Sequence, residues 1–363
     1  MKSQVYSKSI LFWSRLASQI LSPYYVFLNL FRPSYSMYDI NIKTIVVSEY
    51  HRIGDVLIII PTLKMIKKRF PSAHLILICN YNVYELIRHM EIVDEVIPFS
   101  SPWTSWEWSI ARWLRAIRFA RKLSNRGIDL FFDFKGDFRN NWFLWNTKPK
   151  VSFGYNTTGG SYFLTNPYNM NQSLHQRDRS IELVTKANCK ESHCKESHLI
   201  MARAKVNISG CVVFHPGASD INRSWPLEHW ENLAALLSKK LQVCIVKVEE
   251  SLKLIDMLKE KRIPVDIFEG DLVYFMTWLV DQRCLICPDS MAGHLASYVG
   301  IPVISIFGSQ PPELTKPIGS LCKVVVPDNL CKHKREHWRL CRLCMESISP
   351  KKVQLATEEL LNI

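Results

Sequence analysis

Short apolar stretches alternate with longer amphipathic ones along most of this chain. Runs such as "IKTIVVSEY" and "AHLILICN" are apolar and β-branched, which is typical of buried strands. The segment "VLIIIPTLKMIKKRF" lies between them, after the loop "HRIGD", and it predicts a helix whose outer face carries Lys64, Lys67 and Lys68. Strand and helix patterns that alternate at this pitch predict a parallel sheet with helices on both faces.

The alternation stops between residues 146 and 175, which are rich in Asn, Thr, Gly, Tyr and Ser, and restarts near residue 208. The tandem repeat "CKESHCKESH" lies between the halves. Its Cys and His residues suggest a metal site, but its solvating Lys and Glu residues favour a polar linker. Each half predicts a doubly wound, Rossmann-like α/β domain, with a cleft between the two and ligands at the carboxyl ends of the strands. The predicted parts are an apolar extension over 1–42, a first domain over 43–188, a linker over 189–207, a second domain over 208–347 and a C-terminal helix over 348–363.

The extension contains the aromatic stretch "SILFWSRLASQILSPYYVFLNLFRP". Arg15, Ser18, Gln19 and Pro23 interrupt it, so it holds no clean span of about 20 apolar residues. A signal peptide is not expected, because no small-residue cleavage site follows a compact apolar core. Two interpretations remain: a helix packed on the protein, which we favour slightly, and an interfacial anchor whose basic residues face lipid phosphates. Those basic residues are Lys2, Lys8, Arg15 and Arg32.

Charge narrows the class of partner. The 363 residues include 46 Lys and Arg and 33 Asp and Glu, for a formal net charge of +13. Such a charge indicates an anionic partner, and a phosphorylated small molecule or a membrane surface ranks above nucleic acid because no nucleic-acid-binding motif is present.

Cysteine usage indicates the compartment. Eleven scattered cysteines, an odd number, favour a reducing compartment over a disulfide framework. Near the C-terminus, Cys341 and Cys344 have the C-x-x-C spacing of zinc sites, and Cys331, His333 and His337 precede them. Only one such pair exists, so we favour a structural role and expect no bound metal.

Four loops follow predicted strands: "HRIGD", "HPGASDINRSWP", "PDSMAGH" and "FGSQPPE". In the third loop, Ser290 can cap a helix whose free N–H groups would hold a diphosphate. Arg223 of the second loop would supply a fixed positive charge. Taken alone, Ser290 is a simple N-cap and Arg223 a solvated surface charge. Their joint placement at strand ends favours phosphate binding.

Three long motifs occur in one order at domain-sized spacings: "RIGDVLIIIPTLKMIKKRFPSAHL", "HPGAS…RSWPLEHW" and "DSMAGHLASYVGIPVISIFGSQPPE". Together they resemble glycosyltransferase family 9, the ADP-heptose:lipopolysaccharide heptosyltransferases, over about residues 43–355. The resemblance implies the GT-B fold, in which two Rossmann-like domains face each other across a cleft. It also implies that the first domain takes the acceptor, that the second takes the nucleotide sugar, and that the transfer inverts the anomeric centre without a metal.

The resemblance implies roles for single residues. Asp55 would be the general base that takes a proton from the acceptor hydroxyl, although the residues alone are equally compatible with an interaction with the helix dipole. Arg223 would stabilise the charge of the leaving group, but it stands where the family usually has Lys and is wider and bidentate. Met291 stands where many members have Gly, which implies a shifted loop or a different donor. The further implied contacts are Ser290, Met291 and Ala292 to the diphosphate, Asp289 to the sugar, His215, Gly217, Glu249 and Glu250 to the nucleotide, and Arg52 and Gly54 on the acceptor side.

The predicted function is therefore transfer of a heptose or related sugar from an ADP-sugar, the only small molecule required, to a lipopolysaccharide-type or other glycan acceptor. The resemblance places this reaction in the cytoplasm, on the inner face of a bacterial inner membrane. Two alternatives are another nucleotide sugar on the same fold and a non-catalytic nucleotide-sugar binder at the membrane. The stretch "WTSWEWSIARWLRAIRFARK" fits either a packed helix with a solvated basic face or contact with anionic lipid.

Overall fold

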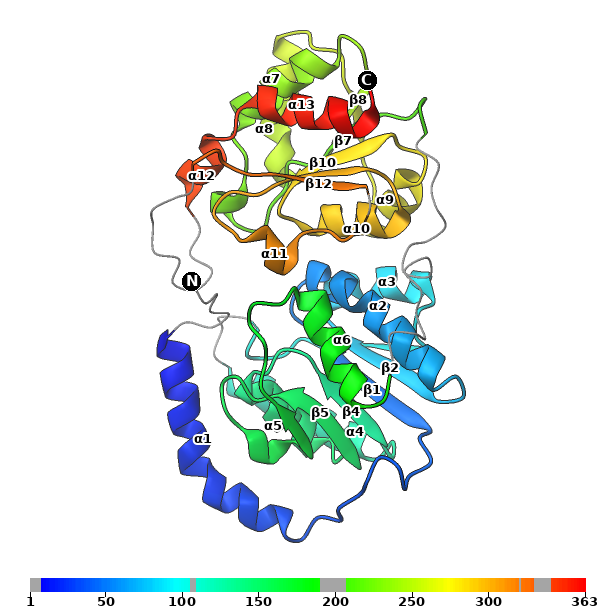
Figure 1. Cartoon of the computed structure of the whole chain (residues 1–363), viewed down its shortest axis with the longest axis vertical. Helices are drawn as coiled ribbons and strands as arrows, with labels where there is room; N and C mark the ends of the chain where they lie inside the picture. Colours follow the sequence, from blue (N-terminus) through cyan, green and yellow to red (C-terminus); the bar gives the residue numbers. More distant parts are fainter. Residues whose placement is uncertain (1–7, 105–108, 190–206, 320, 330–340) are drawn as a thin grey trace. The chain divides into compact units, whose positions relative to one another are not determined.

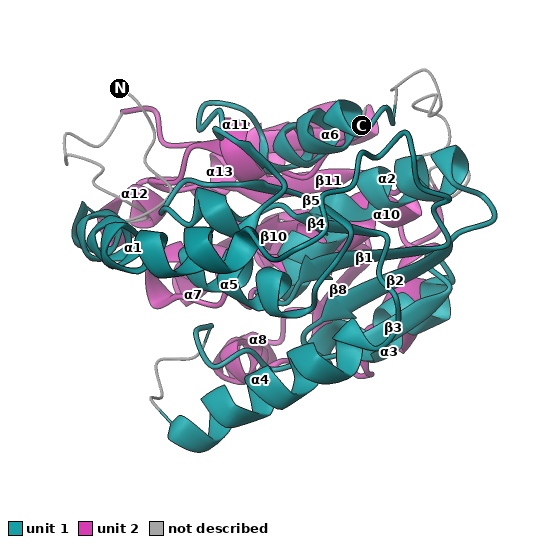
Figure 2. Ribbon diagram, turned by 90° about the horizontal axis from the view of Figure 1, so that it is seen from below, with its two compact units in different colours: residues 1–195 teal, residues 196–363 magenta. Residues whose placement is uncertain are grey.

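The computed structural model describes residues 8–104, 109–189, 207–319, 321–329 and 341–363. The chain divides into two compact units, residues 1–195 and 196–363, which Figure 2 distinguishes by colour. The predicted repeat and linker at 189–207 stay a prediction, because all but two of those residues lie outside the described part.

The first unit is built on a six-stranded parallel sheet in the order β3-β2-β1-β4-β5-β6. Helices α2, α3 and α6 lie on one face of the sheet, and α1, α4 and α5 lie on the other (Figure 2). The strands are β1 (Thr44–Glu49), β2 (His74–Cys79), β3 (Glu95–Pro98), β4 (Leu130–Asp133), β5 (Val151–Tyr155) and β6 (Asn166–Tyr168). The helices are α1 (Lys8–Asn29), α2 (Ile53–Arg69), α3 (Tyr81–Met90), α4 (Ile110–Ser124), α5 (Phe138–Asn146) and α6 (Gln176–Lys186), with a 3-10 turn η1 (Ser161–Phe163).

The second unit repeats this architecture in the order β12-β11-β10-β7-β8-β9, again all parallel (Figure 1). Its strands are β7 (Val212–Phe214), β8 (Val243–Val246), β9 (Asp266–Phe268), β10 (Cys284–Pro288), β11 (Val303–Ile306) and β12 (Cys322–Val325). Its helices are α7 (Leu227–Leu237), α8 (Leu252–Glu260), α9 (Leu272–Leu279), α10 (Met291–Val299), α11 (Pro312–Thr315), α12 (Arg342–Glu346) and α13 (Pro350–Leu361), with 3-10 turns η4 (Ile221–Arg223) and η5 (Glu249–Ser251). The two doubly wound α/β units confirm the predicted fold class.

The structure corrects the prediction in two places. Helix α2 begins at Ile53 rather than after Asp55, because the Asp55 carboxylate accepts the backbone N–H of Arg52 at 3.2 Å and so closes the first turn. Strands β5, β6 and β12 were not predicted. Their sequences are short or contain Gly and Pro, and β6 and β12 lie at sheet edges where an alternating pattern is weakest.

The extension forms helix α1, which is packed on the first unit through one face, as the favoured interpretation expected. No helix in the described part of the chain is both long and apolar enough to traverse a bilayer.

In the core of the second unit, a buried tryptophan connects the segment before α7 to the segment before α13. Trp225, in the loop after η4, is fully buried against Trp230 of α7, and the ring centroids are 5.0 Å apart. The indole N–H of Trp225 donates to the carbonyl oxygen of Ile348 at 2.9 Å, so the turn before α13 is tied to the loop before α7. Helix α13 in turn packs on α7.

Trp225→Phe should lower the free energy of unfolding by about 1–3 kcal/mol, because the Ile348 carbonyl loses its donor and part of the indole volume is left empty. Urea unfolding followed by circular dichroism measures this change. Tyr274→Phe is the matched control: the Tyr274 side chain is 55% exposed, and its change should stay within about 0.5 kcal/mol. Equal stabilities for the two variants would contradict the proposed tie.

Candidate functional site

The two sheets share one topological feature. In each, the first strand lies beside the fourth, so the strand order reverses between β1 and β4 and again between β7 and β10. In open α/β sheets, ligands bind outside the carboxyl ends of the strands at such a reversal. The loops that follow these four strands are therefore where ligand-binding residues are expected in each unit.

In the first unit, Asp55 lies in the first turn of α2, directly after the loop that follows β1. One carboxylate oxygen accepts the Arg52 backbone N–H, and the other lies 2.8 Å from the ammonium nitrogen of Lys135. The Asp55 side chain keeps 17% of its surface exposed. Asp55 thus stabilises the helix start, as the dipole interpretation expects, and also presents a charged carboxylate at the edge of the sheet.

Lys135 bridges two acids. Its ammonium nitrogen lies 3.2 Å from the Glu49 carboxylate as well as 2.8 Å from that of Asp55. Glu49 is the last residue of β1 and is only 1% exposed, and its other oxygen lies 3.0 Å from Nδ1 of His51. The charges of β1, α2 and the loop after β4 are therefore joined in one network.

A second buried acid, Asp133, holds the backbone of the loop that carries Lys135. Asp133, the last residue of β4, is fully buried and accepts hydrogen bonds from the Ser48 hydroxyl at 2.8 Å and the Asn140 amide at 3.0 Å. It also accepts the backbone N–H groups of Lys135 and Gly136. Burial raises the pKa of Asp133. Its role in the loop is to hold the backbone that carries Lys135.

Gly136 makes the turn that aims Lys135. Its φ is +67°, and a Cβ there would lie 2.8 Å from both the Tyr155 Cβ and the Thr157 hydroxyl. An L side chain at this position would meet both strain and a clash. The short turn from β4 into α5 thus depends on glycine.

The charges decide the protonation of Asp55. Burial by itself would raise its pKa, but nearby positive charge, chiefly the Lys135 ammonium that also donates a hydrogen bond to it, outweighs this effect and lowers the pKa below its ordinary value. For Lys135, burial would lower the pKa, but the charges of Asp55 and Glu49 raise it. Asp55 is therefore an ionised carboxylate at neutral pH.

In the second unit, the corresponding edge of the sheet carries an arginine that pairs with an aspartate. Arg223, at the end of η4, places a guanidinium nitrogen 3.3 Å from a carboxylate oxygen of Asp289, the residue after β10. The Nε–H of Arg223 is buried without a hydrogen-bond partner. Arg223 thus lies beside Asp289, and Ser290 is the next residue in the chain.

Helix α10 begins directly after this pair. Ser290 occupies its N-cap position, but its side chain makes no capping hydrogen bond, in contrast to the predicted cap. Ala292 is fully buried, whereas Met291 is partly exposed in the first turn. The positive dipole end of α10 therefore follows Asp289, the partner of Arg223, and the partly exposed Met291 is its first residue.

The nucleotide candidates lie on the next loops of the same sheet. His215 follows β7 and is buried, its Nδ1 has no hydrogen-bond partner, and burial lowers its pKa. A Cβ on Gly217 would lie 3.1 Å from the His215 ring and 3.4 Å from a Glu250 carboxylate oxygen. The structure thus brings Glu250 beside His215 and Gly217.

The sequence interpretation missed Glu49, Asp133 and Lys135. A signal was present, because the stretch "LFFDFKGD" places two acids and a lysine at a strand end, the same position that singled out "HRIGD". What the sequence did not reveal is that β1 and β4 are neighbours, since residues 44–49 and 130–133 are far apart in the chain.

Of the C-terminal Cys and His residues singled out in the sequence, Cys341 and Cys344 lie in the described part of the chain. Cys344 is buried, and the Cys341 N–H donates to the Ser309 hydroxyl at 2.9 Å, which ties the loop after β11 to α12. Cys331, His333 and His337 lie outside the described residues. Within the described residues, no group of three or more His, Cys, Asp or Glu side chains could hold a metal ion, and metal independence stays a prediction.

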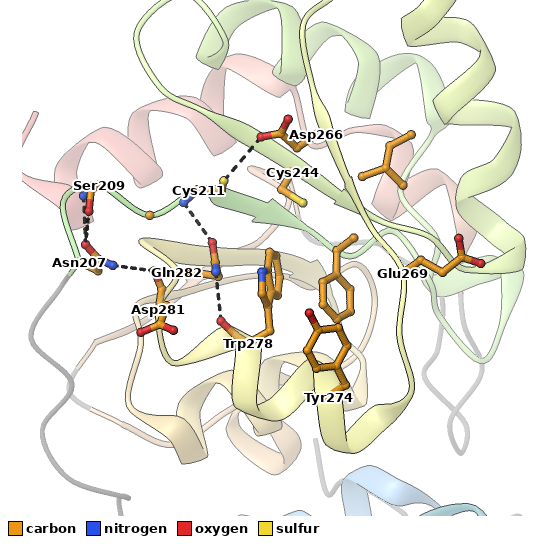
Figure 3. Close-up of a pocket in the computed structure, with 13 residues that line it drawn as sticks. Asn207, Ser209, Cys211, Cys244, Asp266, Glu269, Tyr274, Trp278, Asp281 and Gln282 are labelled. Atoms are coloured by element: carbon orange, nitrogen blue, oxygen red, sulfur yellow. Dashed lines mark hydrogen bonds between the residues drawn. The ribbon is translucent and has the colours of Figure 1, made fainter.

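A separate cavity of about 490 Å³ lies elsewhere in the second unit (Figure 3). Its lining includes Cys211, Asp266 and Gln282, which stand at the amino ends of strands. The Cys211 N–H donates to the Gln282 amide oxygen at 3.2 Å, so part of its polar lining is satisfied internally. This cavity is at the opposite edge of the sheet from Arg223 and Asp289 and is not the predicted donor site.

Lys135→Met should destabilise the protein by about 3–5 kcal/mol at neutral pH, because the carboxylates of Glu49 and Asp55 would lose the ammonium group that lies between them. The folded-state pKa of Asp55 lies below the ordinary value of 3.8. The stabilisation is therefore complete above that value and is lost as the pH falls through the folded-state pKa. Urea unfolding at a series of pH values should show a difference between wild type and variant that is constant near neutrality and shrinks below about pH 4.

Lys67→Met is the matched control for this experiment. Lys67 pairs with Asp94 at 2.6 Å, but both side chains are one-third exposed, so the loss should stay below about 1 kcal/mol. A Lys135 variant that is no less stable than the Lys67 variant would refute the network.

The sequence profile described as "Glycosyltransferase family 9 (heptosyltransferase)" matches residues 116–342, more than half of the chain. A family 9 glycosyl transferase from Veillonella parvula DSM 2008 has a similar structure, with a TM-score of 0.71 and 15% identity over 88% of this chain and 97% of that one. No curated protein matches the chain.

Two Escherichia coli structures are also similar. Heptosyltransferase WaaC, solved with ADP, has a TM-score of 0.68 and 17% identity over 87% of this chain and 99% of that one. The ADP-heptose lipopolysaccharide heptosyltransferase II has a TM-score of 0.69 and 15% identity over 88% and 99%. At these identities the structures show a shared fold, the predicted GT-B type of two doubly wound α/β units. Together with the profile match, this places the chain in glycosyltransferase family 9 as a glycosyltransferase.

Proposed function

We propose that this protein transfers a heptose or a closely related sugar from an ADP-sugar to a glycan acceptor with inversion, and that Asp55 is the general base. The observation that carries the proposal is an ionised, partly exposed Asp55 carboxylate at the strand reversal of the first sheet, held there by Lys135. A base must be deprotonated at the working pH and reachable by the acceptor hydroxyl, and Asp55 meets both conditions.

The proposed step is a single displacement. The acceptor hydroxyl oxygen attacks the anomeric carbon on the side opposite the diphosphate, and the hydroxyl proton passes to Asp55. The bond between the anomeric carbon and the diphosphate oxygen breaks, and its electron pair leaves with ADP. Arg223 and the N-terminus of α10, through Ser290, Met291 and Ala292, stabilise the negative charge that develops on the leaving diphosphate.

Other residues of the second unit orient the donor. Asp289 accepts hydrogen bonds from hydroxyl groups of the sugar, while its pairing with Arg223 holds the guanidinium for the diphosphate. His215, Gly217 and Glu250 take the nucleoside, with Glu250 as the acid that faces the ribose hydroxyls. Support for these roles comes from their shared position at the carboxyl ends of β7, β8 and β10.

The acceptor is proposed to be a phosphorylated glycolipid of the lipopolysaccharide type, on the cytoplasmic face of a bacterial inner membrane. Arg52 and Gly54 lie beside Asp55 in the first turn of α2 and its cap, so they form the acceptor side. The net charge of +13 favours such an anionic acceptor.

A second candidate keeps the reaction but changes the donor. Met291 is partly exposed at the entrance of the helix N-terminus, where its side chain limits how closely a diphosphate approaches the backbone. This observation favours a nucleotide sugar that is seated differently from ADP-heptose.

Asp55→Asn should reduce sugar transfer by about 10²–10⁴-fold while leaving donor affinity nearly unchanged, because the amide cannot accept the hydroxyl proton. Release of ADP from ADP-heptose in the presence of lipopolysaccharide-core lipids measures turnover, and calorimetry with ADP measures donor affinity. Asp178→Asn is the matched control, since Asp178 also lies in the first turn of a helix, α6. Unchanged turnover in the Asp55 variant would defeat the proposed mechanism.

A thermal-shift panel of ADP-, GDP-, UDP- and dTDP-sugars separates the two donor candidates. ADP-sugars should raise the melting temperature most, because a ligand that binds only the folded state stabilises it by mass action. Arg223→Met should abolish most of that shift. Stabilisation by a non-adenine donor alone would reject ADP-heptose and retain the second candidate.

A further inference from the structure

Helix α1 is fixed to the first unit by polar contacts along one face. The Ser18 hydroxyl accepts the Gly160 N–H at 2.8 Å, and the Tyr162 hydroxyl donates to the Ser18 carbonyl at 2.9 Å. At the end of the helix, the Asn29 amide N–H donates to the Tyr162 carbonyl at 2.7 Å and the amide oxygen accepts the Trp145 indole N–H at 2.8 Å. Because these contacts involve the helix at its middle and at its end, its rotation about its own axis is determined.

The opposite face of α1 carries large apolar side chains into solvent. They recur at spacings of seven, four, three and four residues, which places them in one line along the helix and the turn that follows it. Their side chains are between 57% and 72% exposed. We call this line the aromatic stripe: Trp13, Ile20, Tyr24, Phe27 and Phe31.

The aromatic stripe is not an isolated feature of the surface. Inside the packed face, the Trp142 indole N–H of α5 donates to the Tyr25 hydroxyl of α1 at 3.1 Å. Trp142 also packs on Trp113 of α4, with ring centroids 5.7 Å apart. An aromatic layer therefore connects α1 through α5 to α4. Helices α4 and α5 lie on the same face of the first sheet, and α1 packs on η1 and α5 (Figure 2).

Helix α4 gives this face its charge. Its sequence, "IARWLRAIRFARKLS", contains no acidic residue, and its exposed positions carry a basic row of Arg115, Arg118, Arg121 and Lys122. No acidic residue occurs in the chain before Asp39, so α1 adds none. The face therefore combines exposed aromatic rings with a row of positive charges.

We propose that this face of the first unit, formed by the aromatic stripe and the basic row, lies on the surface of a bilayer that contains anionic phospholipid. Phe and Ile side chains enter the acyl region, while Trp and Tyr rings sit at headgroup depth, as their amphipathic rings prefer. The arginines of α4 contact lipid phosphates at the surface. Helix α1 then lies in the plane of the interface and does not cross it, which agrees with Arg15, Gln19 and Pro23 within it.

Charge complementarity selects this occupant over a second copy of the chain. Two copies pairing through this face would bring two basic rows of one sign together, whereas an anionic bilayer neutralises them. The proposal goes beyond the transferase chemistry, because lipid binding needs neither a donor nor Asp55. A failure of lipid binding and a failure of the Asp55 variant are therefore separate results.

Vesicle flotation of the full chain tests the proposal. The wild type should float with vesicles of phosphatidylcholine mixed with phosphatidylglycerol, and less with phosphatidylcholine alone. Phe27→Ser/Phe31→Ser should weaken partitioning by at least about tenfold for each ring removed. Arg115→Gln/Arg118→Gln should weaken binding to the mixed vesicles by about fivefold per charge and reduce its salt dependence.

Leu343→Ser/Leu355→Ser is the matched control, because both residues are exposed, at 65% and 52%, on helices of the second unit. This variant should float like the wild type. Absence of wild-type flotation, or equal flotation of the Phe27/Phe31 variant, overturns the proposal. Sedimentation without vesicles supplies a further check: a dimer that the Phe27/Phe31 variant dissociates would assign the face to a second copy instead.

Discussion

The Lys135 ammonium, held between Glu49 and Asp55, is the interaction on which the first unit's site depends. Three charged groups from β1, α2 and the loop after β4 meet at one sheet edge. Without the ammonium, the two carboxylates would repel each other in a partly buried place. This contact depends on three features of the surrounding structure. Strand β1 pairs with β4, helix α2 starts at Ile53, and Gly136 turns the backbone after β4. The same pairing keeps Asp55 ionised, so one ion pair links the stability of the fold to the chemistry proposed for it.

The second unit uses the same strand order for a different purpose. Where the first sheet ends in carboxylates around one lysine, the second ends in Arg223 beside Asp289 and in the N-terminus of α10. In each unit the sheet thus determines only where the charged loops meet, at the reversal between its first and fourth strands. The loops supply the charge: carboxylates around one lysine in one unit, and a guanidinium beside a helix N-terminus in the other. This division matches what a transferase needs, since its two substrates call for opposite electrostatics.

Helix α1 and helix α4 add a third element that the reaction itself does not require. Polar contacts through Ser18 and Asn29 fix the rotation of α1, and this forces Phe27 and its neighbours on the stripe outward. Leaving such side chains in water costs free energy that a lipid interface would recover. For an enzyme whose proposed acceptor is a glycolipid, a surface of this kind would keep the first unit where its acceptor is.

Local patterning by itself determined much of this protein. Apolar runs of strand length, separated by helical periodicity, were sufficient to predict two parallel α/β units, and the motifs around Asp55, Arg223 and Ser290 were sufficient to suggest where the chemistry lies. Tertiary structure decided the rest. Strands β6 and β12 owe their existence to a neighbouring strand rather than to their own sequences. Lys135 became part of the site only because β4 pairs with β1, and the two faces of α1 were distinguished only when one of them was packed. The physical reason is common to all three: hydrophobic periodicity is a local property of the chain, whereas ion pairs, edge strands and exposed faces depend on which distant residues become neighbours.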